Sequence, residues 1–203
     1  MNYLWLVGVG YLAGSIPWGL LIVRTLRGVD VRSYGSGRTG MTNVMRTAGR
    51  PAAVAALAAD VGKGVGMVVV AKTLTPDAAI HAAVAGAVVV GHVWPVFAGF
   101  RGGRGIATGV GTAGMLDPLG AAIGFLMVFV PIVGVTRYVS LGSVLAVVAV
   151  VVVFTVKAAI GELPIPYLWY VLVVGGLIIW MHRDNIQRLR AGTERKLKSR
   201  TEE

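Results

Sequence analysis

Long apolar runs alternate with short charged segments along the whole chain. The first 23 residues carry no charged side chain, and several later runs are about as long. A helix needs roughly 20 mostly apolar residues to cross a bilayer, and one soluble core could not bury so many runs. The pattern therefore predicts an all-α polytopic membrane protein with seven transmembrane helices, at about residues 2–23, 51–73, 78–97, 106–116, 118–135, 143–160 and 165–181.

The fourth of these segments is the exception in length. Residues 106–116 would form a helix shorter than the thickness of the hydrocarbon core. If this segment does not cross completely, we expect it to be re-entrant and buried within the protein, because unpaired backbone groups cannot face lipid.

Charged residues divide the connections between helices into two groups. Arginines and lysines cluster in three connections and in a basic tail, residues 183–203, whereas the remaining connections carry Asp77, Asp117 and Glu162. Because basic segments stay in the cytoplasm, the N-terminus is expected outside and the C-terminus in the cytoplasm. We expect residues 1–203 to form a single integral membrane domain in the cell inner membrane.

The net charge of +10 would suggest nucleic acid as the partner of a soluble protein. Here the cations lie between apolar runs, so orientation in the membrane explains them first and an anionic substrate second. No nucleic-acid partner is expected. The chain has no cysteine, which excludes thiolate catalysis, Cys-ligated zinc and disulfides, and neither a metal nor a cofactor is expected.

Glycine, hydroxyl and basic residues concentrate in residues 35–46, the first glycine block. The block matches G-x-G-x-x-G, but the dinucleotide fingerprint requires a preceding strand, and a membrane helix precedes it here. Closely spaced glycines still let backbone N–H groups converge on an anion. Ser36, Thr42 and Asn43 add donors, and Arg46 adds a planar fork for phosphate. A flexible linker is the alternative, although a linker needs no arginine among donors.

A second cluster, residues 102–105, is the glycine loop, with the sequence Gly-Gly-Arg-Gly. It lacks the Walker pattern. Its small residues would let the backbone, Arg101 and Arg104 approach a charged ligand closely. Composition supports an alternative equally well, in which the segment is a tight turn and its arginines only orient the protein in the membrane. His92, one turn from a helix end, is expected to be structural.

The segment after the last helix, residues 182–189, begins with His-Arg-Asp. A kinase catalytic loop would have asparagine where Leu189 stands. His182 and Asn185 are three positions apart, so on a helix they would present an imidazole and an amide to the same ligand. A basic tail that only contacts anionic lipid is the alternative.

Two further sets of polar residues lie near these segments. Asp60 and Lys63 are three positions apart inside the second predicted helix, and a structural ion pair is the simplest account of charges there. Ser140 and Ser143, which follow Arg137 in the remaining basic connection, would add hydrogen-bond donors.

Taken in order, these segments resemble the bacterial acyl-phosphate:glycerol-3-phosphate acyltransferase family (PlsY family), small polytopic inner-membrane enzymes. The resemblance covers nearly the whole chain and rests on residues 14–17, the first glycine block, Asp60-x-x-Lys63-Gly64, and residues 91–108, 137–143, 182–189 and 192–194. The family usually has asparagine at the position of Arg38, to which no role is assigned. It usually has lysine at Arg101 and Arg104, and arginine is not an equivalent ligand.

The resemblance implies transfer of an acyl chain from acyl-phosphate to glycerol 3-phosphate, giving 1-acyl-glycerol 3-phosphate (lysophosphatidic acid) and phosphate in phospholipid biosynthesis. Acyl-phosphate is a mixed anhydride with a good leaving group, so no covalent enzyme intermediate is needed, in agreement with the lack of cysteine. The expected partners are these two substrates, membrane lipid and the enzyme that forms acyl-phosphate. The active site is expected at the cytoplasmic face.

Two neighbouring phosphates repel each other, so the site must supply several cations and oriented donors. The predicted catalytic residues are Ser36, Arg46, His182 and Asn185. The predicted substrate-binding residues are Thr42, Asn43, Arg101, Gly102, Gly103, Arg104, Ser140 and Ser143. Two routes stay open for the proton of the attacking hydroxyl: His182 as general base, or the phosphate of the acyl-phosphate itself.

Two other classes of protein fit the sequence less well than the enzyme. An anion transporter would place its binding groups near the membrane midplane, whereas here they are confined to one predicted face. A non-catalytic membrane scaffold would leave the placement of the serines, asparagines and histidine unexplained.

Overall fold

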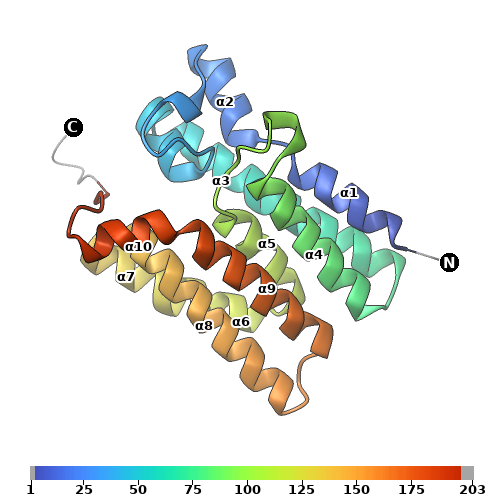
Figure 1. The fold of residues 1–203 in the computed structure, drawn as a ribbon. Coiled ribbons are helices and arrows are strands. Elements are labelled where there is room, and N and C mark those ends of the chain that lie inside the picture. The colour runs from blue at the N-terminus through green and yellow to red at the C-terminus, as the bar shows by residue number, and fades with distance from the viewer. Residues whose placement is uncertain (1–2, 198–203) are drawn as a thin grey trace. The chain divides into compact units, whose positions relative to one another are not determined.

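The computed structural model describes residues 3–197, and all regular structure among them is helical (Figure 1). The chain divides into two compact units, Met1–Leu116 and Asp117–Glu203. The first contains α1 (Trp5–Gly14), α2 (Trp18–Arg27), the 3-10 turn η1 (Val31–Ser33), α3 (Met41–Leu74), α4 (Ala78–Val93), the 3-10 turn η2 (Val96–Ala98) and α5 (Ile106–Leu116). The second contains α6 (Pro118–Ala122), the π-helical segment η3 (Ile123–Phe129), α7 (Val130–Thr136), α8 (Val139–Ala159), α9 (Ile165–Met181) and α10 (Arg183–Arg190).

The predicted multi-pass, all-helical architecture is confirmed. Within the described residues, five helical stretches are long and apolar enough to cross a membrane, and a sixth is added if α9 and α10, which meet at 54°, form one broken span. The five are Trp5–Arg27, Met41–Leu74, Ala78–Ala98, Pro118–Thr136 and Val139–Ala159. The fourth predicted segment is short, as expected, because α5 has only 11 residues. Length and composition therefore identify five or six spans, and the predicted total of seven stays a prediction.

Glycines bring the helices of the first unit into close contact. A methyl group on Gly14 would overlap the backbone of Val88, and one on Gly91 would overlap the carbonyl of Tyr11, so α1 and α4 touch backbone to backbone. Gly64 and Gly111 have the same effect between α3 and α5. Membrane helices pack through such small residues because lipid supplies no hydrophobic drive between them.

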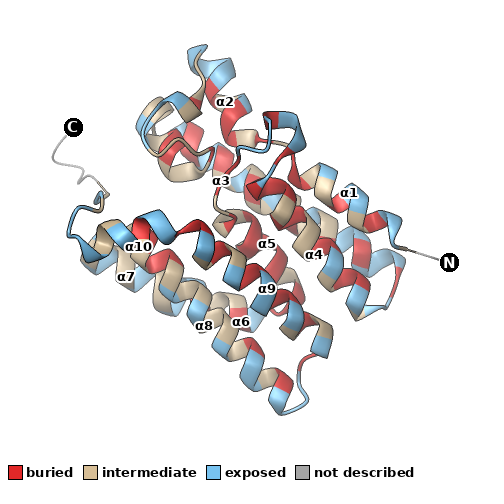
Figure 2. Ribbon diagram, in the orientation of Figure 1, coloured by how far each residue is buried: buried red, intermediate tan, exposed pale blue. Residues whose placement is uncertain are grey.

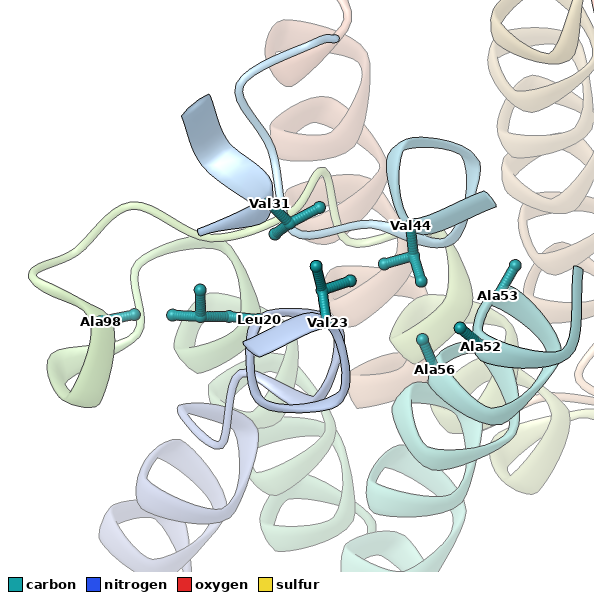
Figure 3. Packing of buried hydrophobic residues seen from close by; sticks show 8 residues of the cluster. All are labelled: Leu20, Val23, Val31, Val44, Ala52, Ala53, Ala56 and Ala98. Atoms are coloured by element: carbon teal, nitrogen blue, oxygen red, sulfur yellow. The ribbon is translucent and has the colours of Figure 1, made fainter. Parts of the chain in front are cut away.

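One buried cluster joins the irregular end of the first unit (Figure 3). It draws Leu20 and Val23 from α2, Val31 from η1 and Ala98 from η2. Its remaining members, all on α3, are Val44, Ala52, Ala53 and Ala56. The helix is broken within this region, because Gly49 has a left-handed φ of 84°. The cluster thus holds the first glycine block and the connection after α4 against the same helices.

The second unit exposes apolar residues along its helices, and Figure 2 shows exposed positions along them in pale blue. Val148, Val152 and Val156, spaced four residues apart on α8, are all exposed. A stripe of this kind is expected on a helix that faces lipid. Near one end of this helix two charged groups pair, since Lys157 Nζ lies 2.6 Å from Asp117 Oδ1, and the Asp117 carboxylate also accepts a hydrogen bond from the backbone N–H of Gly120 at the start of α6.

Candidate active site

Asn43 gives the first glycine block its shape. The side chain is buried at the start of α3, and its Nδ2 donates to the carbonyl oxygens of Val31, Tyr34 and Arg38 at 2.8, 3.0 and 2.9 Å. Its Oδ1 accepts from the backbone N–H of Ser36 at 3.1 Å. In this structure Asn43 thus closes the segment into a compact loop, and the predicted direct contact with substrate stays a prediction.

Two glycines make this loop sterically possible. Gly35 has a φ of 55°, and a methyl group there would overlap Oδ1 of Asn43. Gly19, on α2, lies so close to the carbonyl oxygen of Thr39 that a side chain would collide with it. The loop therefore rests directly on the first turn of α2. The side chain of Ser36 is half-buried and that of Arg46 is exposed.

Arg32 ties the segment before the first glycine block to the connection after α4. Its guanidinium pairs with Asp30 at 2.7 Å and donates through Nη1 to the carbonyl oxygen of Ala98 at 2.7 Å. The hydrogen bonds from Arg32 lower the pKa of the Asp30 carboxyl below its ordinary value. The structure therefore brings two of the four predicted basic segments together within the first unit.

The glycine loop packs onto the end of α4. The N–H groups of Gly102 and Gly103 donate to the carbonyl oxygens of Val93 and His92, both at 3.2 Å. Both glycines are buried, and a methyl group on Gly103 would overlap the His92 imidazole. These two N–H groups therefore stabilise the turn, and a phosphate contact by the loop would come from its other groups.

Glu194 is the centre of a hydrogen-bond network in the second unit. Its Oε1 accepts from Ser140 Oγ at 2.8 Å and from Asn185 Nδ2 at 2.6 Å. Its Oε2 accepts from Arg188 Nε at 2.8 Å. Burial alone would raise the pKa of the Glu194 carboxyl, but the hydrogen bonds from Asn185, Ser140 and Arg188 together lower it.

This network fixes which way the Asn185 amide points. A carboxylate can only accept hydrogen bonds, so the atom facing Glu194 must be the amide nitrogen. The amide oxygen, Oδ1, is then buried and has no hydrogen-bond partner among the residues that the structure describes. A buried acceptor of this kind is costly unless something donates to it, which makes Oδ1 a candidate ligand group.

His182 is also held in one orientation. Its Nδ1 lies 2.8 Å from the carbonyl oxygen of Ile178 on α9. Because a carbonyl only accepts, Nδ1 carries the proton in the neutral ring, and Nε2 is the basic nitrogen. Ser143, one turn into α8, donates its hydroxyl to the Val139 carbonyl at 2.8 Å and keeps its oxygen as an acceptor.

The predicted site residues thus form two groups. The first unit holds Ser36, Thr42, Asn43, Arg46 and residues 101–104, and the second unit holds Ser140, Ser143, His182 and Asn185. Glu194 was part of the family resemblance but was given no role. Its position gave little signal, because the basic tail also contains Asp184, Glu202 and Glu203. Among the described residues, no three His, Asp or Glu side chains gather into a metal-binding group.

Comparison with known proteins identifies the family. Residues 4–192 match the family model described as glycerol-3-phosphate acyltransferase.

The chain belongs to the glycerol-3-phosphate acyltransferase family.

Curated glycerol-3-phosphate acyltransferases are similar to this family member over nearly their whole length. The protein of Halalkalibacterium halodurans is 43% identical, with 95% of each chain covered. That of Rubrobacter xylanophilus is 43% identical, with 97% of this chain and 96% of the relative covered. That of Myxococcus xanthus is 44% identical, with 94% and 97% covered.

A solved member of the family has the same fold. The crystal structure of PlsY, an integral membrane glycerol 3-phosphate acyltransferase, in its glycerol 3-phosphate form matches with a TM-score of 0.89 and 38% identity, covering 96% of this chain and 95% of PlsY. The lysophosphatidic acid form of PlsY matches with a TM-score of 0.86 and the same identity and coverage. The chain is therefore a multi-pass membrane protein of the PlsY family, and acylation of glycerol 3-phosphate in phospholipid synthesis is the activity these similarities support.

Proposed function

We propose that this protein transfers an acyl chain from acyl-phosphate to glycerol 3-phosphate, giving 1-acyl-glycerol 3-phosphate and phosphate. One observation carries the proposal: PlsY, which shares this fold at 38% identity, has been solved in a glycerol 3-phosphate form and a lysophosphatidic acid form. These are an acceptor and the product of its acylation. Acyl-phosphate suits this chain as donor because a mixed anhydride can be attacked directly, which agrees with a sequence that offers no cysteine for a covalent intermediate.

The proposed topology has seven segments, with the N-terminus outside, the C-terminus in the cytoplasm and the active site at the cytoplasmic face of the inner membrane. α5, at 11 residues and about 1.5 Å per residue, is only about 16 Å long. It still ends beside the end of α3, since Lys72 Nζ donates to the Met115 carbonyl at 2.5 Å. A re-entrant glycine loop followed by α5 would therefore complete one crossing of the membrane. Basic and acidic connections would then still alternate between the two sides of the membrane.

In the first unit, the proposed phosphate ligands are Ser36, Thr42 and Arg46 of the first glycine block, with Arg101 and Arg104 beside the glycine loop. Arginine suits this role because its planar fork makes two parallel hydrogen bonds to phosphate oxygens. Asn43, Gly102 and Gly103 would support these groups through the backbone contacts described above.

In the second unit, His182 and Asn185 would act on the attacking hydroxyl, beside Ser140 and Ser143. The hydroxyl oxygen of glycerol 3-phosphate forms a bond to the acyl carbonyl carbon, and the bond from that carbon to the phosphate oxygen breaks. The hydroxyl proton passes to Nε2 of His182 or to the departing phosphate. Asn185 Oδ1 would accept a hydrogen bond from the other hydroxyl of glycerol 3-phosphate and so orient the attacking one.

Purified protein in detergent, supplied with acyl-phosphate and glycerol 3-phosphate, tests the proposal. We expect phosphate release that requires both substrates, together with formation of the acylated product. No release, combined with anion uptake into liposomes, would indicate a transporter instead.

The roles of the second unit are tested by His182→Ala, with Asp184→Asn in the first turn of α10 as the control. Asp184 is exposed, and its ion pair with Arg183 is long at 3.8 Å. We expect turnover to fall about 100-fold or more in His182→Ala, as is typical for loss of a general base, and to be unchanged in the control. Normal substrate binding with near-normal turnover in His182→Ala would assign the proton to the phosphate.

A further inference from the structure

Three charged or titratable side chains meet in the interior of the first unit, beneath the glycine loop. Lys63 Nζ on α3 lies 2.9 Å from Asp60 Oδ1 and 3.0 Å from Nδ1 of His92 on α4. His92 Nδ1 is also 3.3 Å from Asp60 Oδ1. All three side chains are at most 5% exposed. The predicted Asp60–Lys63 pair is confirmed, and His92 extends it to a second helix.

The ammonium of Lys63 also binds the break between α1 and α2. It donates to the carbonyl oxygens of Gly14 and Ile16 at 2.9 and 3.0 Å. The chain leaves the helical path here, because Pro17 has no N–H to continue the backbone ladder. Carbonyl groups at such a break need donors when they are away from water, and Lys63 supplies two of these bonds.

The other end of the network supports the glycine loop. The His92 ring is fixed on its Nδ1 side by Lys63 and Asp60, and its Nε2 side faces Gly103, where an added methyl group would overlap it. The carbonyl of His92 also accepts the hydrogen bond from the Gly103 N–H. The position of this loop therefore depends on where the network holds the imidazole.

The first glycine block rests on the same network through α2. Lys63 fixes the break from which α2 starts, and Gly19 in the first turn of α2 contacts the Thr39 carbonyl of the block. Both segments that carry proposed phosphate ligands are thus held by one buried cluster.

We propose that Asp60, Lys63 and His92 are positioning residues that set the first glycine block and the glycine loop at the spacing required for binding phosphate-bearing substrates. This inference rests on the proposed function. Stability alone is a poor explanation, because a buried ion pair is often no more stabilising than apolar residues of the same volume. A network that joins three segments at defined distances instead gives those segments one fixed arrangement.

A double-mutant cycle between His92 and Gly103 tests this assignment. Gly103→Ala should raise the KM for one of the two phosphate-bearing substrates at least 10-fold and change kcat less than 3-fold, because the methyl group pushes the loop off the imidazole. In the His92→Ala background the methyl group has room, so adding Gly103→Ala should change that KM less than 2-fold. His92→Ala alone should raise the same KM, because the loop loses its support.

Gly62→Ala is the matched control, since Gly62 is a helical glycine next to Lys63 with no atom within 4 Å of the added methyl group. It should behave as the wild-type protein. If His92→Ala does not fold, His92→Asn takes its place in the cycle, because it removes the ring and keeps a polar group near Lys63.

Two results would overturn the positioning role. One is an equal effect of Gly103→Ala on KM in both backgrounds, and the other is unchanged KM values in an active His92 variant. Failure of the wild-type protein to use acyl-phosphate would instead refute the proposed donor. In that case calorimetry measures the Kd of glycerol 3-phosphate for each variant of the cycle, and the criteria given for KM apply to that Kd.

Discussion

Replacing Glu194 with glutamine tests whether its carboxylate holds the second unit's polar residues in place. The carboxylate, whose side chain is only 7% exposed, accepts three hydrogen bonds, from Ser140, Asn185 and Arg188. Glutamine keeps one oxygen, so at least one donor loses its acceptor and faces an amide N–H instead. A hydrogen bond to a charged group contributes about 1.5–3 kcal/mol. Since Arg188 is partly exposed, we expect a loss of about 2 kcal/mol.

Thermal unfolding in detergent and steady-state kinetics measure this effect. A loss of 2 kcal/mol corresponds to roughly 4–8 °C in Tm for a chain of this size. Turnover should also fall, because the neutral amide of glutamine holds the Asn185 amide less firmly than the carboxylate does. The matched control is Asp184→Asn, which removes the same charge from an exposed position on α10. Equal effects of Glu194→Gln and Asp184→Asn would refute the reasoning, because only one of the two carboxylates holds buried donors.

The same residue predicts the direction of a pH dependence. The pKa of Glu194 is lower in the folded protein than its ordinary value of about 4.3. Its stabilising contribution is therefore complete above that value and is lost as the pH falls through the lowered folded-state pKa. Tm measured from pH 7 down to pH 3 should fall less steeply in Glu194→Gln than in the wild-type protein. Parallel acid limbs would contradict the assignment.

Two further substitutions test the packing described above. Gly35→Ala should reduce kcat/KM at least 10-fold, because the residue has a positive φ and its methyl group would overlap Asn43 Oδ1, whereas Gly40→Ala, with open space around it, should stay within 2-fold. Lys157→Met should destabilise the fold by about 3 kcal/mol, the low end for breaking a buried pair, because it leaves the Asp117 carboxylate unpaired. The double variant with Asp117→Asn should recover most of this loss in Tm, and no recovery would show that the lysine stabilises by packing alone.

Features that depend on neighbours in the sequence were predictable. The lengths of the apolar runs predicted the membrane helices. A helix closes its own backbone hydrogen bonds, so only its outer surface has to suit the surrounding lipid. The Asp60–Lys63 pair was predictable for the same reason, since residues three apart share a helix face. The short α5 followed from the distance between the glycine loop and Asp117.

Features that depend on distant partners were not predictable from one sequence. Spacing alone cannot show that Glu194 accepts from Ser140, 54 positions away. It also cannot show that Lys63 reaches the carbonyl oxygens of Gly14 and Ile16. Asn43 was predicted as a donor to substrate from its residue type. The structure shows its donors directed to backbone carbonyl groups, because the loop folds back around it.

The position of Glu194 has a practical consequence for anyone who shortens the protein. The family match ends at residue 192, and a boundary drawn there would appear to discard only a charged extension. That cut would delete the carboxylate that anchors Asn185, and with it the backbone hydrogen bond from Leu197 to Arg137. We expect a protein truncated at residue 192 to keep every helix that the structure describes and to lose activity, so affinity tags belong beyond residue 197.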